Sequence, residues 1–356
     1  MSEWKEYKLE DIAEILDHKR CPLSSMQRSK RKGAYPYYGA SGIIDYIDDY
    51  IFEGEHVLIS EDGENLRTRK TPIAFLADGK YWVNNHAHII KSDSIHNKLI
   101  CYYFAQLDLN PYITGAVQPK LSQESLKNIP LYLPVSKDER KEIVSILSSL
   151  DDKIDLLRRE NATLEALAET LFLHYFIENT NPAWKEGKLG ELMTIGSGKG
   201  LKRSDFVEKG QYPVLGANGE IGRANDYLIN ENDSVLYTGR VGTLGKIFRI
   251  EGERVWLSDN TLVIKPKRYF NYVYFILKQA NLQDLDVGST QPLIRQSDVV
   301  DIDVIIPNDK IIEAFEKEVC PLFEKIKSNQ RQILTLSSQR DTLLPRLMFG
   351  EVKVGE

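Results

Sequence analysis

The chain has 356 residues, 42% of them hydrophobic and 28% charged, a balance typical of soluble globular proteins with material for two or three domains. Its three cysteines, Cys21, Cys101 and Cys320, form no CxxC pair, which excludes a disulfide scaffold and a small zinc module. The N-terminal segment is charged and no apolar run reaches membrane-spanning length, so we expect a soluble cytoplasmic protein. The net charge of −6 argues only weakly against nucleic acid, because a phosphate-binding face is a local property.

An internal repeat organises the chain. The segment WKEYKLEDIAEI at Trp4 returns as WKEGKLGELMTI at Trp184, and YPYYGASG returns as YPVLGANG. Further along, KYWVNNHAHII aligns with RVWLSDNTLVI, and GAVQP at Gly115 aligns with GSTQP at Gly288. The order is preserved, and the offset changes only from 180 (184 − 4) to 173 (288 − 115) residues. The sequence therefore predicts a tandem duplication of one domain.

Each copy has the same internal plan. Short β-type runs and Gly-rich turn signals come first, and a helix is expected near 96–107 in copy one and 270–282 in copy two. We predict an α+β fold with a curved sheet, whose strand order the sequence does not give. The predicted boundaries are 1–135 and 181–308 for the globular domains, and 136–180 and 309–356 for the helical region after each.

Both helical regions keep a 4-3 apolar spacing for about four heptads, which is typical of a coiled coil. Ser136 and Glu139 form a capping-box pattern at the start of the first helix. Pro321 lies inside the second pattern and predicts a kink or a late helix start. The seam positions are Ile143, Leu147, Leu150, Ile154, Leu157, Asn161, Leu164, Ala168 and Leu171 in the first helix, and Phe315, Val319, Leu322, Ile326, Asn329, Ile333, Leu336, Arg340 and Leu343 in the second.

Asn161 and Asn329 interrupt the two apolar patterns. If the helices run antiparallel about a centre near position 159 of the first copy, the two side chains meet across the seam. We hypothesise that their hydrogen bond fixes the register of an antiparallel coiled coil. The alternative is that both lie partly exposed at a frayed seam, and then replacing both with Leu leaves register and orientation unchanged.

Basic residues gather in matching segments of the two globular domains. The first helical region holds 6 basic and 10 acidic residues, so part of the negative charge lies away from those domains. A single basic loop is more often only a solvated surface, but repetition in both copies favours a phosphate-binding face. The candidates for phosphate or guanine contacts are Arg28, Lys30, Arg31, Arg67, Arg69 and Lys70 in copy one, and Lys199, Lys202, Arg203 and Arg240 in copy two.

Amide side chains near these segments are candidates for reading adenine, because an amide can pair with the edge of that base through two hydrogen bonds. They are Asn85, Asn218, Asn260, Gln118 and Gln291. For Gln118 and Gln291 there is a structural alternative: the repeated GxxQP turn is needed to close each domain.

Patterns for catalysis and metal binding fail. The GSGKG segment at 196–200 resembles a phosphate-binding loop but lacks its first glycine and the Ser or Thr after the lysine. His86 and His88 alternate on an expected strand and so share a face, but no third ligand has a telling spacing. Core packing or hydrogen bonding is therefore favoured over a metal. The sequence predicts no catalytic residue and no metal on this chain.

In this order the motifs resemble the specificity (S) subunit of type I restriction-modification systems. The resemblance rests on the duplicated domain, the paired GxxQP segments, the long helix after each domain and the terminal LLPRLMFGEV, and it covers essentially the whole chain. It implies two target-recognition domains, at 1–135 and 181–308. The helical regions 136–180 and 309–356 would form the antiparallel coiled coil.

The resemblance also implies a function: a non-catalytic reader of double-stranded DNA, with one recognition domain for each half of a bipartite, asymmetric target. The helices would act as a spacer and as the dock for two methyltransferase (M) subunits, and motor-nuclease (R) subunits would join the complex. S-adenosylmethionine, ATP and Mg²⁺ are expected on those partners rather than on this chain. The residues alone leave an alternative, a non-enzymatic scaffold whose duplicated module binds proteins and whose basic loops are only soluble surface.

Overall fold

The computed structural model describes residues 3–115, 117–288, 290–352 and 354. The chain forms two compact units: unit 1 takes the residues up to 156 and those from 332 onward, and unit 2 takes 157–331. The second residues of the two GxxQP segments, Ala116 and Ser289, lie outside the described residues, as do the extreme ends of the predicted regions 1–135 and 309–356.

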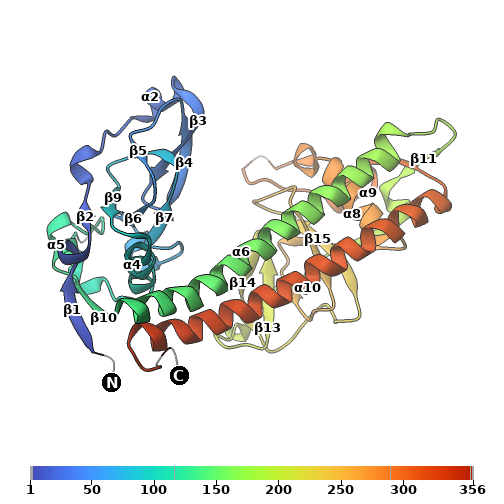
Figure 1. The fold of residues 1–356 in the computed structure, drawn as a ribbon. Helices are drawn as coiled ribbons and strands as arrows, with labels where there is room; N and C mark the ends of the chain where they lie inside the picture. The colour runs from blue at the N-terminus through green and yellow to red at the C-terminus, as the bar shows by residue number, and fades with distance from the viewer. Residues whose placement is uncertain (1–2, 116, 289, 353, 355–356) are drawn as a thin grey trace. The chain divides into compact units, whose positions relative to one another are not determined.

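The globular part of unit 1 contains three small sheets and short helices (Figure 1). Its strands are β1 (Trp4–Lys8), β2 (Glu14–Ile15), β3 (Lys32–Gly39), β4 (Gly42–Ile47), β5 (Phe52–Glu53), β6 (His56–Ser60), β7 (Ala74–Ala77), β8 (Lys80–Val83), β9 (Ala87–Lys91) and β10 (Pro130–Pro134). Its helices are α1 (Leu9–Ile12), α2 (Ser25–Ser29), α3 (Asn65–Thr68), α4 (Ser94–Gln106) and α5 (Gln123–Lys127), with 3-10 turns at Asp17–Lys19 and Asn110–Tyr112. The sheet orders are β1-β10, β2-β9-β6-β7 and β4-β3-β8-β5, in which only β3 and β8 pair in parallel.

The globular part of unit 2 repeats this plan. Its strands are β11 (Lys185–Lys188), β12 (Met193–Ser197), β13 (Tyr212–Gly216), β14 (Gly219–Ala224), β15 (Ser234–Gly239), β16 (Ile247–Glu251), β17 (Trp256–Leu257), β18 (Thr261–Pro266) and β19 (Asp303–Ile306). Its helices are α7 (Leu189–Leu192), α8 (Phe270–Gln279) and α9 (Gln296–Val300), with 3-10 turns at Arg203–Asp205 and Leu282–Leu285. The sheet orders are β11-β19, β12-β18-β15-β16 and β14-β13-β17.

The two units therefore share one strand order except for β5, an edge strand without a counterpart in the described sheets of unit 2, and this confirms the predicted duplication and the α+β class. One contact repeats as well. The indole Nε1 of Trp82 donates to the carbonyl of Cys21 at 2.5 Å, and Nε1 of Trp256 donates to the carbonyl of Lys199 at 2.7 Å. In each unit this bond ties the chain that leaves the edge strand β2 or β12 to the sheet that contains β8 or β17. The predicted helices near 96–107 and 270–282 are α4 and α8.

Two long helices join the units. α6 (Lys137–Leu173) continues into a π-helical turn at His174–Glu178, and α10 spans Asp309–Met348. Ser136 caps the first helix, because its Oγ accepts the backbone N–H of Glu139 at 3.3 Å. The predicted alternative of a late helix start at Pro321 is wrong, because α10 is helical from Asp309 through that residue, while the kink stays a prediction. Pro321 is exposed, so water can reach the carbonyl that loses its usual N–H donor.

In unit 1 the start of α6 and the end of α10 complete the core of the globular part. Ile143 and Leu147 of α6 share one buried cluster with Leu344 and Leu347 of α10. Farther along the same pair of helices, Arg340 donates from Nη1 to Oδ1 of Asp151 at 3.0 Å. The two helix segments therefore run antiparallel within this unit.

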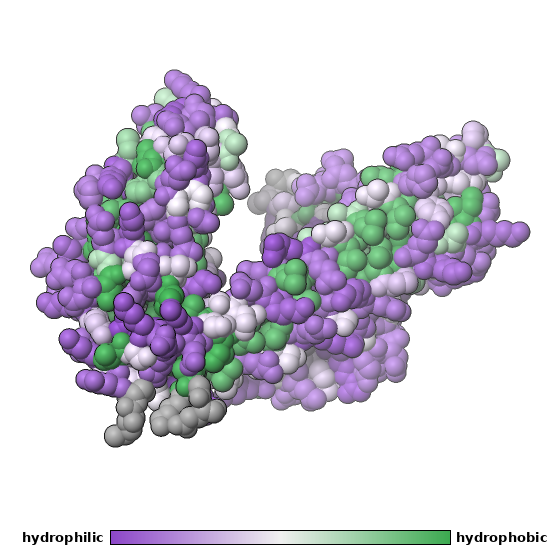
Figure 2. All heavy atoms as spheres, in the orientation of Figure 1, coloured by the Kyte–Doolittle hydropathy of each residue, from purple (hydrophilic) through white to green (hydrophobic). Residues whose placement is uncertain are grey.

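In unit 2 the end of α6 and the start of α10 take the same role. The ring of Phe172 stacks on that of Phe275 at a centroid distance of 5.4 Å and meets the ring of Phe315 edge-on at 6.0 Å. Phe176 and Tyr272 enlarge this cluster. Figure 2 shows hydrophobic residues along the seam between α6 and α10 and hydrophilic residues on their outer faces, the division expected from the 4-3 pattern.

Asn161 and Asn329 lie together in the seam of unit 2. The side-chain Nδ2 of Asn329 donates to Oδ1 of Asn161 and to Oε2 of Glu160, both at 2.9 Å. Asn329 is fully buried, so the alternative of a frayed, exposed seam does not describe this residue. Lys325 lies one turn earlier on α10 and approaches Glu160 at 3.6 Å.

Candidate nucleic-acid interface

The loop after β15, Arg240–Thr243, is a basic segment predicted to meet DNA whose backbone makes hydrogen bonds to two neighbouring segments. Arg240 donates its backbone N–H to the carbonyl of Asn260 at 2.8 Å, and its own carbonyl accepts from Ile294 at 3.0 Å. Gly239 closes the loop, because a Cβ there would lie 2.0 Å from the carbonyl oxygen of Thr243. Gly242, with φ of +84°, makes the left-handed turn that glycine adopts without strain. The backbone of this loop is therefore fixed on both sides.

Four residues predicted from the sequence come together around this loop. Asn218, at the tip of the β13–β14 hairpin, donates from Nδ2 to Oγ1 of Thr243 at 2.8 Å. Asn260 holds the backbone of Arg240, and Gln291 precedes Pro292, whose carbonyl accepts the N–H of Gly242 at 3.0 Å. The side chains of Asn218, Asn260 and Gln291 are exposed. Arg240 therefore lies among three amides that can pair with bases.

The guanidinium of Arg240 has few acceptors. Its Nη1 donates to Oγ of Ser197 at 3.3 Å, and its Nε is buried without a hydrogen-bond partner. Among the residues that the structure describes, no carboxylate lies within ion-pair distance of it. The buried, unpaired Nε carries a cost in free energy that an acceptor on a bound molecule would remove.

The other basic residues of copy two lie on the chain that leaves β12. Lys199 is fixed through its backbone, which donates to Leu257 at 2.8 Å and accepts from the indole of Trp256. Its side chain and those of Lys202 and Arg203 are exposed. These cations have the freedom that contacts to a phosphate backbone tolerate.

Unit 1 has the same loop frame with different side chains. The backbone N–H of Glu61 donates to the carbonyl of His86 at 2.9 Å, and its carbonyl accepts from Leu121 at 2.7 Å. Gly63 donates to the carbonyl of Pro119 at 3.0 Å, as Gly242 does to Pro292. The loop Glu61–Gly63 is thus the counterpart of Arg240–Gly242. Where unit 2 has an arginine, unit 1 has a glutamate.

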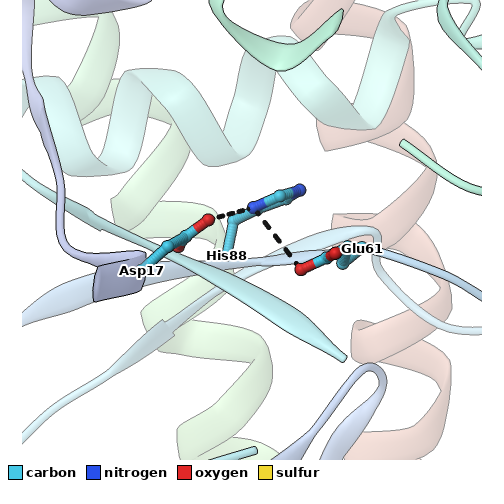
Figure 3. A group of neighbouring side chains, drawn as sticks. All are labelled: Asp17, Glu61 and His88. Atoms are coloured by element: carbon cyan, nitrogen blue, oxygen red, sulfur yellow. Dashed lines mark hydrogen bonds and ion pairs between the residues drawn. The ribbon is translucent and has the colours of Figure 1, made fainter. Parts of the chain in front are cut away.

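The charge of Glu61 is matched inside unit 1 (Figure 3). His88 lies between two carboxylates, with its Nδ1 2.5 Å from Oδ2 of Asp17 and 3.8 Å from Oε2 of Glu61. Arg20 pairs with both carboxylates, and Lys120 approaches Oε1 of Glu61 at 3.2 Å. Burial by itself raises the pKa of Asp17 and of Glu61, but the hydrogen bonds and positive charges of these neighbours hold both pKa values below the ordinary 3.8 and 4.5.

Asp17, Glu61 and His88 have the donor atoms of a metal site, all within 4.8 Å of one another. Two cations already neutralise the carboxylates, and the second ring nitrogen of His88 lies 2.8 Å from the carbonyl of Leu121. The group is therefore a satisfied buried network, as the sequence favoured for His88. The prediction that His86 and His88 share one strand is wrong, because His86 lies in the exposed turn before β9, where it bonds Asp62 at 2.8 Å.

The first basic cluster of copy one does not lie on a free loop. Arg28 is in α2, its guanidinium lies over the ring of Tyr37, and it pairs with Asp45 at 3.3 Å. Arg31 pairs with Asp48 at 2.8 Å. These ion pairs offset the positive charge, which weakens the case for both as DNA contacts. Lys30 is exposed, with no partner among the described contacts of its side chain.

The second basic cluster of copy one includes a structural arginine. Arg69 has a left-handed φ of 49° and donates to the carbonyls of Phe104 and Ala105, both at 3.2 Å, and to that of Leu107. It caps the carboxyl end of α4, which gives Arg69 a role in the fold, and its predicted DNA contact stays a prediction. Arg67 donates from Nη2 to the carbonyl of Gly115 at 3.0 Å, and Lys70 is exposed.

Asn85 and Gln118 are exposed, and they adjoin His86 and Pro119, whose carbonyls accept hydrogen bonds from the loop Glu61–Gly63. The GxxQP turn itself closes tightly, since a Cβ on Gly115 would lie 2.2 Å from the carbonyl of Gln118, and one on Gly288 would lie 1.8 Å from that of Gln291. The backbone of this turn supports the structural alternative, while the glutamine side chains stay available. The sequence did not reveal Ser197 and Thr243, whose hydroxyl groups hold predicted residues in place.

The family model for the type I restriction modification DNA specificity domain matches residues 1–166 and 181–334, which together form most of the chain. The chain belongs to this family. The specificity subunit is similar over 99% of its length to the type I restriction enzyme MjaIX specificity subunit of Methanocaldococcus jannaschii, at 26% identity and covering 94% of that relative. It is also similar to the type I restriction enzyme HindI specificity subunit of Haemophilus influenzae, at 22% identity over 99% of this chain and 100% of that one.

The fold agrees with this assignment. A crystal structure of the type I restriction-modification S subunit from M. genitalium superposes with a TM-score of 0.64 at 16% identity, covering 97% of this chain and 96% of that one. Proteins of this family recognise DNA and are not themselves enzymes. In the described part of the specificity subunit, no helix is long and apolar enough to cross a membrane.

Proposed function

We propose that this specificity subunit reads a bipartite, asymmetric sequence in double-stranded DNA, with the globular part of each unit reading one half-site. The observation that carries the proposal is the repeated loop frame. The backbone bonds around Glu61 in unit 1 recur around Arg240 in unit 2, while the side chains differ in charge. One frame with unlike side chains suits two unlike half-sites, because base edges are read by side chains in the grooves.

The proposal extends to the partners. The chain docks two methyltransferase subunits through its paired helices α6 and α10, and motor-nuclease subunits join them. S-adenosylmethionine for adenine methylation, and ATP with Mg²⁺ for translocation and cleavage, belong to those subunits. The family assignment supports this arrangement, and the chain itself supplies the sequence preference.

Selection from a random duplex library tests the reading. The full chain, assembled with the methyltransferase subunit of the same system, is expected to enrich two short, unlike motifs at a fixed gap. Exchange of residues 181–308 for those of a relative should replace one motif and keep the other. Enrichment of a single continuous motif would mean that one recognition domain is silent.

The same complex separates DNA reading from a protein scaffold. Contacts to phosphates release counterions, so the affinity for the selected duplex should fall steeply as salt rises from 50 to 200 mM, by roughly 10³-fold if about six phosphates are neutralised. A well-formed complex that enriches no sequence would contradict the proposal and leave the scaffold function.

A further inference from the structure

We infer that Arg240 reads a guanine in the major groove of the half-site recognised by unit 2, and that this residue is a main source of the difference between the two half-sites. The inference rests on the proposed function and names the base chemistry of one of its sites. It follows from four features of the loop Arg240–Thr243.

The first feature is the unmatched charge. The guanidinium of Arg240 has one hydrogen bond, to Oγ of Ser197 at 3.3 Å, and a buried Nε without a partner. Two other arginines of unit 2 have carboxylate partners: Arg249 pairs with Glu251 at 2.7 Å, and Arg254 pairs with Glu231. Arg240 therefore retains N–H donors for the O6 and N7 acceptors of guanine, the pair of atoms that a guanidinium fork fits.

The second feature is rigidity. Backbone bonds to Asn260 and Ile294 hold Arg240 itself, and Gly239 and Gly242 close the turn around it. Discrimination between bases requires a side chain held at a fixed place, because a misplaced fork loses one of its two hydrogen bonds. The exposed Lys202, on the chain that leaves β12, has no such frame and suits a phosphate instead.

The third feature is the set of side chains that surround Arg240. The exposed amides of Asn218, Asn260 and Gln291 surround its loop, and Thr243 fixes the first of them through a 2.8 Å hydrogen bond. Amides pair with adenine edges, so the loop lies at the centre of a group of side chains suited to bases. A cation that served only the phosphate backbone would be expected at the rim of such a group.

The fourth feature is the contrast with unit 1. Glu61 occupies the position of Arg240 in the repeated frame, and Arg20, Lys120 and His88 satisfy its carboxylate within the unit. Among its described residues, unit 1 therefore has no cation without an anionic partner at the position that corresponds to Arg240. A guanine contact made by unit 2 through Arg240 has no counterpart in the half-site of unit 1.

The experiment is library selection with the full complex carrying Arg240→Gln, beside the wild type. In the wild type, one position of the unit 2 motif is expected to be guanine. In the variant, preference for guanine at that position should fall about 5- to 150-fold, and adenine should gain there, because an amide pairs with the edge of adenine. All other positions, and the whole unit 1 motif, should stay unchanged.

Two further variants distinguish base reading by Arg240 from the effect of its charge and from a phosphate contact. Arg240→Lys keeps the positive charge without the planar fork, and should weaken the guanine preference while overall affinity is largely kept. Lys202→Ala is the control for a phosphate contact, and should lower the affinity for all sequences alike. Continued selection of the unit 1 motif shows that a variant complex is folded and bound to DNA.

The remaining outcomes overturn the inference. A uniform loss of affinity in Arg240→Gln with guanine still preferred would make Arg240 a phosphate contact. A unit 2 motif without guanine would also overturn it, while two half-sites at a fixed gap would leave the proposed function standing. Only the failure of the wild type to enrich any motif would remove the proposed function and the inference together.

Discussion

Asn329 is fully buried and donates from Nδ2 to Oδ1 of Asn161 across the seam between α6 and α10, at 2.9 Å. The two residues stand 168 positions apart in the sequence, one in each copy of the helix. Most neighbouring seam positions are apolar, so a shift of one helix along the other would separate the two amides. The pair therefore favours one register of the two helices over the alternative registers.

Breaking the pair on one side should be costly. Asn161→Leu leaves the amide of Asn329 buried with only Glu160 as acceptor, and the free energy of unfolding should fall by about 1–3 kcal/mol. The double variant, Asn161→Leu with Asn329→Leu, replaces polar groups by a packed apolar pair and should recover most of that loss. Urea denaturation of the two single variants and the double variant gives the coupling between the residues. Additive effects would show that the hydrogen bond does not stabilise the seam.

The buried network of unit 1 predicts sensitivity to acid. Asp17 and Glu61 have pKa values lowered in the folded state, so the folded protein binds fewer protons there than the unfolded chain. Their contribution to stability is present above the unfolded values of 3.8 and 4.5 and is lost as the pH falls through the lowered ones. Urea midpoints measured from pH 7 down to pH 3 should therefore decline more steeply for the wild type than for Asp17→Asn. Parallel curves for the two proteins would exclude this network as a cause of acid sensitivity.

Replacing Arg69 tests whether this residue stabilises the fold or contacts DNA. Arg69→Ala removes the side-chain hydrogen bonds that cap the carboxyl end of α4, and should lower stability by about 1–3 kcal/mol. The bases selected from a duplex library should be unchanged. Lys70→Ala, at the exposed neighbouring position, is the matched control and should alter stability by less than about 0.5 kcal/mol. A changed base preference in Arg69→Ala with normal stability would instead support the predicted DNA contact.

The aromatic cluster at the end of α6 predicts where a substitution in unit 2 lowers the stability of the fold most. Phe172 is buried against the rings of Phe275 and Phe315, so Phe172→Ala should cost about 3–5 kcal/mol through lost burial and the cavity left behind. Leu334→Ala, at a position of α10 that is 71% exposed, should be nearly neutral. Thermal unfolding with calorimetry compares the two. Similar losses for both variants would contradict the burial of Phe172 in a folded core.

The sequence predicted the duplication, the two long helices and the asparagine pair because each depends on a periodic pattern. The repeated Trp82 and Trp256, for example, occupy the same place in both copies and make the same contact. Strand order could not be predicted, since it depends on pairing between distant segments. That pairing is also what brings Asp17 to His88, 71 positions away.

For the candidate DNA contacts, the sequence indicated the basic segments but not which residues of the two units are equivalent. The sequence grouped Arg67, Arg69 and Arg240 only as basic residues of matching segments, whereas the backbone bonds place Glu61 at the position of Arg240. The signal that would have found this is the glycine shared by the two loops, Gly63 and Gly242. The capping role of Arg69 depends on a left-handed backbone conformation, which no sequence pattern predicts for an arginine.

Salt dependence separates the two kinds of cation in unit 2. Lys202 and Arg203 are exposed on the chain that leaves β12, and we expect them to contact phosphates. Each replacement by Ala should reduce the slope of log affinity against log salt by about 1, because one fewer counterion is released. Lys310→Ala, at an exposed position near the start of α10, should leave the slope unchanged as the control. Fluorescence anisotropy with the selected duplex at several salt concentrations measures these slopes. If removal of Lys202 and Arg203 left the slope unchanged, the phosphate contacts of unit 2 would have to lie elsewhere, since a neutralised phosphate always contributes to it.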